Sequence, residues 1–156
     1  MIFYFTREGF DALNAKIREV EGRIEDLEKG TGAACQTGHE TWHDNFDYEE
    51  GVRQQRMWSK RLDELVDIKR NVRVIEPAQS GRAVAIGRTI TILDEDTAEI
   101  WTFRIGSYMI FRENSEISEV SYAAPLAIFL AGSMVGDVRS GIVGQEKKRF
   151  LVLAVE

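Results

Sequence analysis

The chain has 156 residues, of which 44% are hydrophobic and 29% charged, and its formal net charge is −6. This composition is typical of a soluble globular protein with one ordinary domain or two small ones. The acidic balance argues against a free, sequence-independent DNA binder, because such proteins neutralise phosphates with basic side chains. With the single cysteine Cys35, no disulfide can form within the chain, and no apolar run approaches the ~20 residues that span a membrane. We therefore expect a cytoplasmic protein without a signal peptide.

The first segment, residues 10–27, predicts an amphipathic helix. Its apolar residues recur at intervals of three and four residues, which is the heptad spacing of a coiled coil. Thr6 is the expected N-cap, and Gly9 occupies the position at which a capping box would have glutamate. Gly30 and Gly32 are expected to end the helix. The predicted seam consists of Phe10, Leu13, Ile17, Val20, Ile24 and Leu27.

A second helical period runs from about Asn45 to Asn71, and at 1.5 Å per residue it extends ~40 Å. Because isolated helices are marginal in water, we expect the two apolar faces to bury each other in an antiparallel hairpin. The glycine-containing break favours this hairpin over a parallel dimer, and the tip is expected between Cys35 and Asp44. The apolar positions of the second helix are Tyr48, Val52, Leu62, Leu65, Val66, Ile68 and Val72, with Met57 and Trp58 between them.

The second half of the chain changes character and predicts a small β-rich domain. Residues 94–96 (Asp-Glu-Asp) are predicted to form a hairpin turn, and residues 125–130 a short helix that starts at proline and ends before Gly132. We expect the boundary between the halves near residues 76–81. The predicted strands are residues 83–86, 89–93, 99–105, 119–121, 138–143 and 149–155.

Several short motifs occur in a fixed order along the chain. The predicted tip contains Asp44-Asn45-Phe46-Asp47-Tyr48, and the second helix continues with Gln54-Gln55 and Arg61-Leu62. The later motifs are Ile117-Ser118, Ala124-Pro125-Leu126-Ala127, Gly132 and Val135-Gly136-Asp137-Val138. In order and spacing they resemble the GreA/GreB family of bacterial transcript-cleavage factors, whose tip reads Glu-Asn-Ala-Glu-Tyr and whose later motifs read Ile-Ser, Ser-Pro-Leu, Gly and Val-Gly-Asp-Val. The resemblance covers almost the whole chain.

The resemblance implies an α+β fold with an N-terminal antiparallel coiled-coil hairpin, residues 1–76, and a C-terminal FKBP-like domain with one helix, residues 77–156. It also implies two partners, bacterial RNA polymerase and the 3′ end of the nascent RNA within the elongation complex. The β-domain would dock at the rim of the secondary channel, which the hairpin enters. We expect a monomer that does not bind membranes. The implied docking residues are Pro125, Leu126, Gly136 and Asp137.

In the family, two tip carboxylates help to hold a second Mg²⁺ in the polymerase active centre, where backtracked RNA is cut. Mg²⁺ prefers oxygen ligands, so carboxylates suit this role. The resemblance therefore implies a factor that is not an enzyme by itself. The free protein would hold no metal or cofactor, and Mg²⁺ would be shared with the polymerase.

The tip departs from the family pattern Asp-x-x-Glu, because the matching positions are Thr41 and Asp44. Threonine cannot be an anionic ligand, although Glu40 is one residue away. In one hypothesis Glu40 and Asp44 form the metal-holding pair and cleavage is retained. In the other, the tip enters the channel without catalysing, and the protein modulates or inhibits the polymerase. The residues expected to support the tip are Asn45, Asp47 and Tyr48.

Arg53, Arg56 and Lys60 fall on one face of the second helix, at positions i, i+3 and i+7. The resemblance implies that these cations contact RNA, for which phosphates are suitable partners. The alternatives are a solvated helix face or ion pairs with the first helix, where the available acids are Glu21, Glu25 and Asp26.

The tip also raises two open questions. Cys35, His39 and His43 have a spacing that could place three zinc ligands on one helical face, but a solvated loop is the alternative that we prefer. Trp42 and Phe46 either pack the loop against the hairpin or touch the polymerase. The sequence contains no nucleophile–base pair or glycine-rich phosphate loop. It also lacks an apolar aromatic pocket signature, and a fold alone would not establish prolyl isomerase activity.

Overall fold

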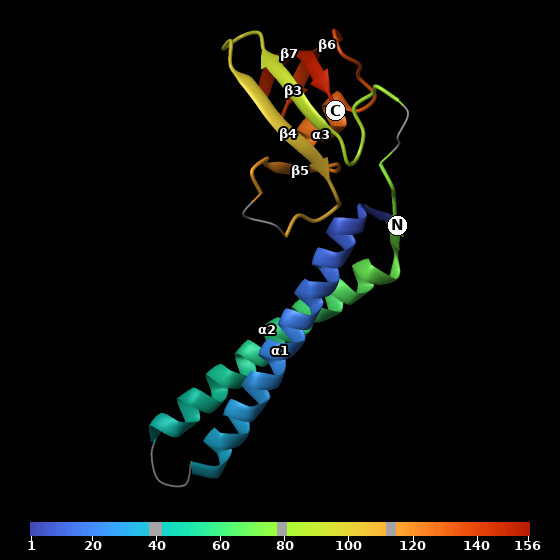
Figure 1. Cartoon of the computed structure of the whole chain (residues 1–156). Coiled ribbons are helices and arrows are strands. Elements are labelled where there is room, and N and C mark those ends of the chain that lie inside the picture. The colour runs from blue at the N-terminus through green and yellow to red at the C-terminus, as the bar shows by residue number, and fades with distance from the viewer. Residues whose placement is uncertain (38–41, 78–80, 112–114) are drawn as a thin grey trace. The chain divides into compact units, whose positions relative to one another are not determined.

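The computed structural model describes residues 1–37, 42–77, 81–111 and 115–156, without the side chains of residues 31–37 and 42–45. Its contacts divide the chain into two compact units (Figure 1). The helical unit is Leu13–Asn71, and the β-unit combines Met1–Ala12 with Val72–Glu156. The division predicted after residue 76 stays a prediction. None of the described helices is long and apolar enough to cross a bilayer.

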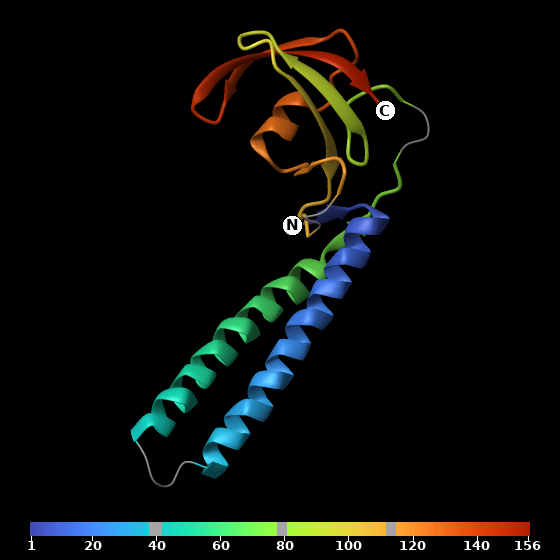
Figure 2. The ribbon, with the colours of Figure 1, turned by 60° about the vertical axis from the view of Figure 1, so that its left-hand side comes forward.

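The helical unit is built from α1, Arg7–Thr37, and α2, Trp42–Arg70, which run side by side in opposite directions (Figures 1 and 2). In the described part of this unit, the buried apolar residues are Leu13, Ile17 and Val20 on α1 and Leu65 on α2. Farther along the α1 seam, Ile24 and Leu27 are half-buried. Burying one such side chain contributes about 1.5–3 kcal/mol, so the predicted heptad seam provides the main stabilisation of the hairpin.

The predicted end of the first helix at Gly30 and Gly32 is wrong, because α1 continues to Thr37. A glycine inside a helix costs about 1 kcal/mol relative to alanine, which is too little to stop a long helix by itself. Gly30 lies in open space, with no neighbouring atom within 4 Å of the point where a β-carbon would stand. Cys35 therefore belongs to α1, whereas His43 belongs to α2, and His39 lies outside the described residues.

Helix α1 begins with a cap that is completed from a distant part of the chain. Thr6 Oγ1 accepts a hydrogen bond from the Gly9 amide at 3.1 Å, which confirms Thr6 as the N-cap. The Thr6 amide in turn donates to Ser107 Oγ at 3.0 Å, and Ser107 is 2% exposed. Ser107 thus takes the place of the glutamate missing from the capping box. A β-carbon at residue 9 would overlap Ser107 Oγ, so glycine permits this approach.

The start of the chain is fastened within the β-unit by strand pairing. Strand β1, Phe3–Phe5, runs parallel to β2, Val72–Val74. The Tyr4 amide donates to Tyr122 Oη at 3.2 Å, and the Tyr4 carbonyl accepts from the Tyr108 amide at 3.1 Å. The rings of Phe3 and Tyr108 lie 4.4 Å apart between centroids. A short N-terminal strand is therefore held by hydrogen bonds on both edges.

The main sheet of the β-unit has five strands in the order β5-β4-β3-β7-β6. Its pairs are antiparallel except β4 with β5, and α3, Pro125–Leu130, lies beneath the curled sheet (Figure 2). Sheet and helix share a core that includes Ile92, Phe103, Leu130 and Phe150. Together with the hairpin, this confirms the α+β fold class. The strands are β3, Thr89–Asp94; β4, Ile100–Gly106; β5, Glu119–Ser121; β6, Val138–Val143; and β7, Glu146–Val155.

Two predicted strands need correction. Residues 83–86 do not form a strand, because Ala83 makes only an isolated bridge with Met134 and the chain then turns away. Strand β7 starts earlier than predicted, at Glu146, since the hairpin turn at Gly144 pairs Val143 with Glu146. The added residues are mostly charged and exposed, and hydrophobic periodicity does not detect such strand ends.

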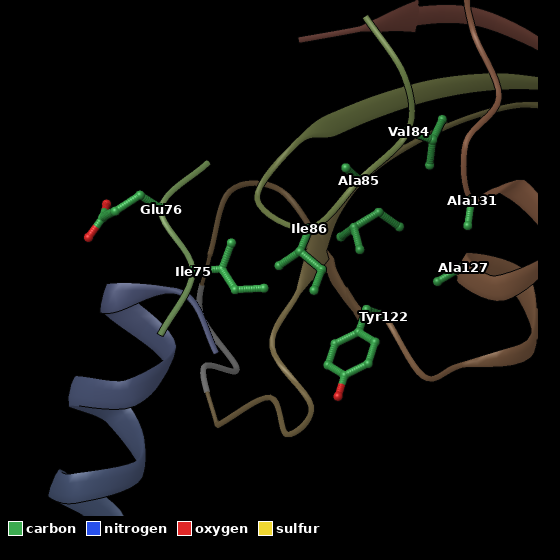
Figure 3. Close-up of a pocket in the computed structure, with 9 residues that line it drawn as sticks. Ile75, Glu76, Val84, Ala85, Ile86, Tyr122, Ala127 and Ala131 are labelled. Carbon is green, nitrogen blue, oxygen red and sulfur yellow. The ribbon is translucent and has the colours of Figure 1, made fainter. Parts of the chain in front are cut away.

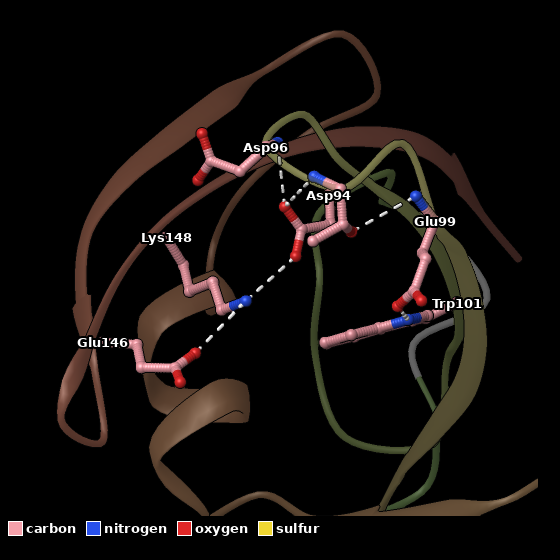
Figure 4. A network of polar contacts seen from close by, with 7 residues as sticks. Asp94, Asp96, Glu99, Trp101, Glu146 and Lys148 are labelled. Atoms are coloured by element: carbon pink, nitrogen blue, oxygen red, sulfur yellow. Dashed lines mark hydrogen bonds and ion pairs between the residues drawn. The ribbon is translucent and has the colours of Figure 1, made fainter.

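The turn between β3 and β4 contains a buried carboxylate (Figure 4). Asp94 is 1% exposed, and its Oδ1 accepts hydrogen bonds from the amides of Asp96 at 3.0 Å and Thr97 at 3.4 Å. Its Oδ2 accepts from Lys148 Nζ at 3.2 Å, and Lys148 also pairs with Glu146 at 3.4 Å. Burial raises the pKa of Asp94, but the hydrogen bonds from these amides and from Lys148 outweigh it, so the pKa is lowered.

The contact at Gly9 predicts opposite outcomes for two glycine substitutions in α1. Gly22→Ala adds a β-carbon in open space and should stabilise the protein by about 0.5–1 kcal/mol, as alanine does in helix interiors. Gly9→Ala should instead destabilise it by about 1–3 kcal/mol, because the methyl group displaces Ser107 from the cap. Urea unfolding of both variants measures this difference. Equal stabilisation by the two substitutions would show that Ser107 does not hold the helix start.

The lowered pKa of Asp94 predicts a loss of stability in acid. The unfolded carboxyl titrates near ~3.9, so stability falls as the pH drops below that value and through the lower pKa of the folded state. Asp94→Asn should remove this dependence and reduce proton uptake on unfolding by up to about one proton. Urea unfolding at several pH values gives that slope. Asp96→Asn, in the same turn but with an exposed side chain, is the control and should keep the wild-type slope.

Candidate functional site

The predicted tip lies where α1 and α2 are joined. Glu40 and Thr41 lie outside the described residues, and so do the side chains of Asp44 and Asn45, although Asp44 and Asn45 belong to the first turn of α2. The roles assigned to these residues therefore stay predictions, as does the zinc hypothesis. No group of three metal-ligating side chains occurs in the described part of the chain.

The first described side chains of α2 form an exposed acidic and aromatic turn. Phe46 is 70% exposed and Tyr48 is 42% exposed, and Asp47 and Glu49 are also exposed. An apolar ring with this exposure contributes little to the stability of the hairpin. The exposure of Phe46 therefore argues against its packing against the hairpin.

The three basic residues predicted on α2 are all exposed, as expected for one helix face. Arg53 pairs with Glu50 on its own helix at 2.6 Å, and Glu50 also accepts a hydrogen bond from Gln54 at 3.0 Å. The hydrogen bonds from Gln54 and Arg53 lower the pKa of Glu50. Among the described residues, Arg53, Arg56 and Lys60 make no ion pair with α1, so the interhelical alternative is not observed.

One interhelical contact that the sequence did not predict lies farther along the hairpin. The Arg23 guanidinium stacks over the ring of Trp58, with 4.8 Å from its carbon to the ring centroid. Beside it lies an open cavity of about 350 Å³, which is also lined by Asp26, Leu27 and Gln54. Cation–π pairs at exposed sites contribute about 0.5–1 kcal/mol. The contact joins α1 to α2 at this point of the hairpin. In the sequence, the only indication of it was that the aromatic residue Trp58 stands within a polar stretch.

The four predicted docking residues lie in the same part of the β-unit. Pro125 and Leu126 start α3, whereas Gly136 and Asp137 form the turn before β6, a strand that α3 contacts. Asp137 Oδ2 accepts a hydrogen bond from the Met134 amide at 2.8 Å, and Gly136 has a φ of 89°. Asp137 and Gly136 therefore shape the turn, whatever contacts they make with a partner.

The same region carries exposed apolar side chains that sequence reasoning missed. On β6, Val138 is 43% exposed and Ile142 is 74% exposed. Both alternate along the strand with Gly141, which faces Phe129 of α3, so they lie on the side of β6 that points away from α3. Isolated exposed apolar residues are common, but neighbouring ones on one side of a strand are typical of a protein-binding surface. We call Val138 and Ile142 the apolar face. Ile128 is also exposed, at 64%, but it belongs to α3 on the other side of the strand.

The β-unit also contains an apolar pocket of about 400 Å³, for which no signature was found in the sequence (Figure 3). Ile75 and Ile86 lie on one side of it, Ala127 and Ala131 of the α3 region on another, and Tyr122 is its aromatic residue. The lining residues come from separate stretches of the chain. A pocket assembled in this way has no local sequence pattern.

Fold and surface together define a class of two-unit protein, which consists of a helical hairpin and a β-unit, each with exposed apolar side chains. No model of a protein family matches the chain. The chain is 28% identical to transcription elongation factor GreA of Rickettsia conorii, covering 99% of this chain and 94% of that protein. It is 29% identical to GreA of Rickettsia typhi over the same shares.

Among solved structures, the chain is similar to GreA factor homolog 1 (Gfh1) of Thermus thermophilus. The two are 21% identical, the match covers 100% of this chain and 99% of that one, and the TM-score is 0.47. The full-length sequence similarity to the GreA proteins confirms the predicted resemblance to the GreA/GreB family of transcription elongation factors.

Proposed function

We propose that the chain is a transcription elongation factor that binds bacterial RNA polymerase through the secondary channel and stimulates cleavage of backtracked RNA. The observation that carries this proposal is the full-length similarity to GreA in a chain whose hairpin consists of helices of 31 and 29 residues. At 1.5 Å per residue such helices measure ~45 Å, which is long enough to carry a tip into a deep channel.

The β-unit would provide the docking surface. Its apolar face begins at Val138, directly after Asp137 in the turn before β6. Exposed apolar side chains are unfavourable in water, so covering them with a partner contributes favourably to the free energy of binding. The position of Gly136 and Asp137 directly before Val138 supports the assignment for this side of the β-unit.

The tip would supply ligands. Glu40 and Asp44 would offer carboxylate oxygens, which are the donors that Mg²⁺ prefers, and Asn45, Asp47 and Tyr48 would support them. When bound in the polymerase, Mg²⁺ lowers the pKa of coordinated water and stabilises developing charge. The exposure of Asp47 at the start of α2 keeps a further carboxylate in reach of solvent cations.

A second function is favoured by one observation in the sequence. Thr41 stands where the family pattern has its first acid, which leaves the tip with fewer anionic ligands. A tip of this kind could occupy the channel and modulate the polymerase without efficient cleavage. Both functions require the same docking, so they differ only in the fate of the RNA.

The cleavage function can be tested directly with a stalled, backtracked elongation complex in Mg²⁺. The full chain should shorten the transcript, and Asp44→Ala should slow cleavage by at least ~10²-fold, because loss or misplacement of a metal ligand has effects of this size. Gel analysis of labelled RNA measures the rates. If the wild type binds the complex but leaves the RNA intact, the channel-modulator function holds instead.

Docking through the apolar face predicts that charge placed there weakens polymerase binding. Val138→Glu should reduce affinity at least ~10-fold with little change in thermal stability, since the side chain is already 43% exposed and the charge would be desolvated in the complex. Ile100→Glu is the control, because Ile100 is also exposed but lies on β4, which β3 and β7 separate from β6. Equal effects of the two substitutions on binding would place the docking surface elsewhere.

A further inference from the structure

Strand β6 is the outermost strand of the five-stranded sheet (Figure 1). It pairs with β7 on one edge, and among the described residues no strand pairs with its other edge. A free strand edge presents a row of unpaired amides and carbonyls, which soluble proteins commonly protect with lysine, proline or a bulge. The sequence of β6, Val-Arg-Ser-Gly-Ile-Val, contains neither lysine nor proline, and its pairing with β7 runs through all six residues without a bulge.

The pairing with β7 determines which backbone groups of β6 face the free edge. The turn between the two strands has two residues, so Val143 and its partner on β7, which flank the turn, exchange hydrogen bonds. Before the other end of β6, the Asp137 carbonyl accepts a hydrogen bond from a β7 amide at 2.9 Å. Because backbone groups alternate along a strand, the odd-numbered residues bond to β7. The amides and carbonyls of Val138, Ser140 and Ile142 therefore point to the free edge.

The side chains of β6 divide between its two sides with the same alternation. Gly141 faces α3, since a β-carbon at this residue would lie 2.9 Å from the Phe129 ring. Arg139 is two residues away and lies on the same side. The apolar face, Val138 and Ile142, lies on the opposite side and is exposed to solvent. One set of residues thus combines free backbone groups with exposed apolar side chains.

We propose that β6 pairs with β6 of a second copy of this chain, antiparallel, about a two-fold axis that passes between the two Ser140 residues. In this register Val138 lies opposite Ile142 of the second copy, and the two Ser140 residues lie opposite each other. These residues are the ones whose backbone groups face the free edge. Three residue pairs would each exchange two hydrogen bonds, which gives about six between the copies.

This register is self-complementary on both sides of the strand. On the outer side it pairs apolar Val138 with apolar Ile142, and such cross-strand pairs stabilise a sheet. On the α3 side, Arg139 lies opposite Gly141 of the second copy, which leaves room for the arginine. Sliding the strands by one pairing step either places the two Arg139 residues opposite each other, which is unfavourable, or leaves Val138 opposite the turn. The sequence of β6 therefore favours a second copy of itself as the partner.

The dimer should be weak and visible only at high protein concentration. A contact between two six-residue strands is smaller than the ~1,200 Å² of stable interfaces, so we expect a dissociation constant on the order of 10⁻⁴ M. At lower concentrations the chain would be the monomer that the family resemblance implies. The inference goes beyond the proposed function and does not depend on it.

The test measures the mass of the full chain by sedimentation velocity at protein concentrations up to about 1 mM. Ser140→Pro should raise the dissociation constant at least about tenfold, because it removes two hydrogen bonds between the copies and none to β7. Ser140→Ala is the matched control, since it keeps the amide, and should dimerise within about threefold of wild type. Thermal unfolding checks that both variants fold as the wild type does.

A pair of charges tests the register and does not depend on the proline variant. Val138→Glu and Ile142→Lys should each weaken the dimer, and the double variant should recover it, because each new carboxylate lies opposite a new ammonium group of the second copy. Within one strand residues 138 and 142 are ~13 Å apart, so the recovery cannot arise inside one chain.

Three results would overturn the inference: a wild-type chain that stays monomeric at the highest concentration, Ser140→Pro that dimerises as wild type does, or a double-charge variant no better than the single ones. Binding to core RNA polymerase, measured in parallel, identifies another occupant. If the wild type is monomeric and Ser140→Pro weakens polymerase binding, the edge belongs to the polymerase interface and the inference fails alone. If the dimer forms as expected but the polymerase is not bound, only the proposed function fails.

Discussion

The burial of one apolar seam holds the two helices of the hairpin together, and the position of every side chain on the hairpin depends on this pairing. Helices of 31 and 29 residues would be only marginally stable apart in water. Leu13, Ile17 and Val20 on α1 and Leu65 on α2 are removed from solvent, and each contributes on the order of 2 kcal/mol. This concentrated burial allows the remaining length of both helices to be polar. The surface thereby left free is where acidic and basic residues can meet a charged partner.

The start of α1 shows how a local rule can be satisfied by a distant residue. Thr6 caps the helix, but the glutamate that would complete a capping box is replaced by Gly9. Ser107, from the end of β4, accepts the Thr6 amide instead and is buried there. Glycine at residue 9 is needed because a side chain would occupy the space of the serine. The β-unit thus includes the first turn of the hairpin's own helix.

Charge on α2 is segregated along its length. Asp47, Glu49 and Glu50 precede Arg53 and Lys60, so a carboxylate-rich turn gives way to a cationic stretch. Under the proposed function, this arrangement would place carboxylates near a Mg²⁺ ion and cations near the RNA phosphates. The ion pair between Arg53 and Glu50 lies at the boundary between the two stretches.

Local pattern in the sequence determined the elements of the fold. The heptad spacing from Phe10 to Leu27, Thr6 as N-cap and the helix at Pro125 are all present in the structure, because each depends on residues close in the chain. Tertiary contacts decided what pattern could not. Residues 83–86 did not become a strand, because Ala83 pairs only with Met134 in an isolated bridge.

The same division holds for the candidate site. The sequence by itself determined that Arg53, Arg56 and Lys60 share one helix face, since helical spacing is enough to place them. Only the tertiary structure showed that Phe46 is exposed, that Val138 and Ile142 are exposed on β6 and that Ser107 completes the cap. Exposure and long-range contact depend on which elements pack together, and that information is spread over the whole chain rather than held in any one segment.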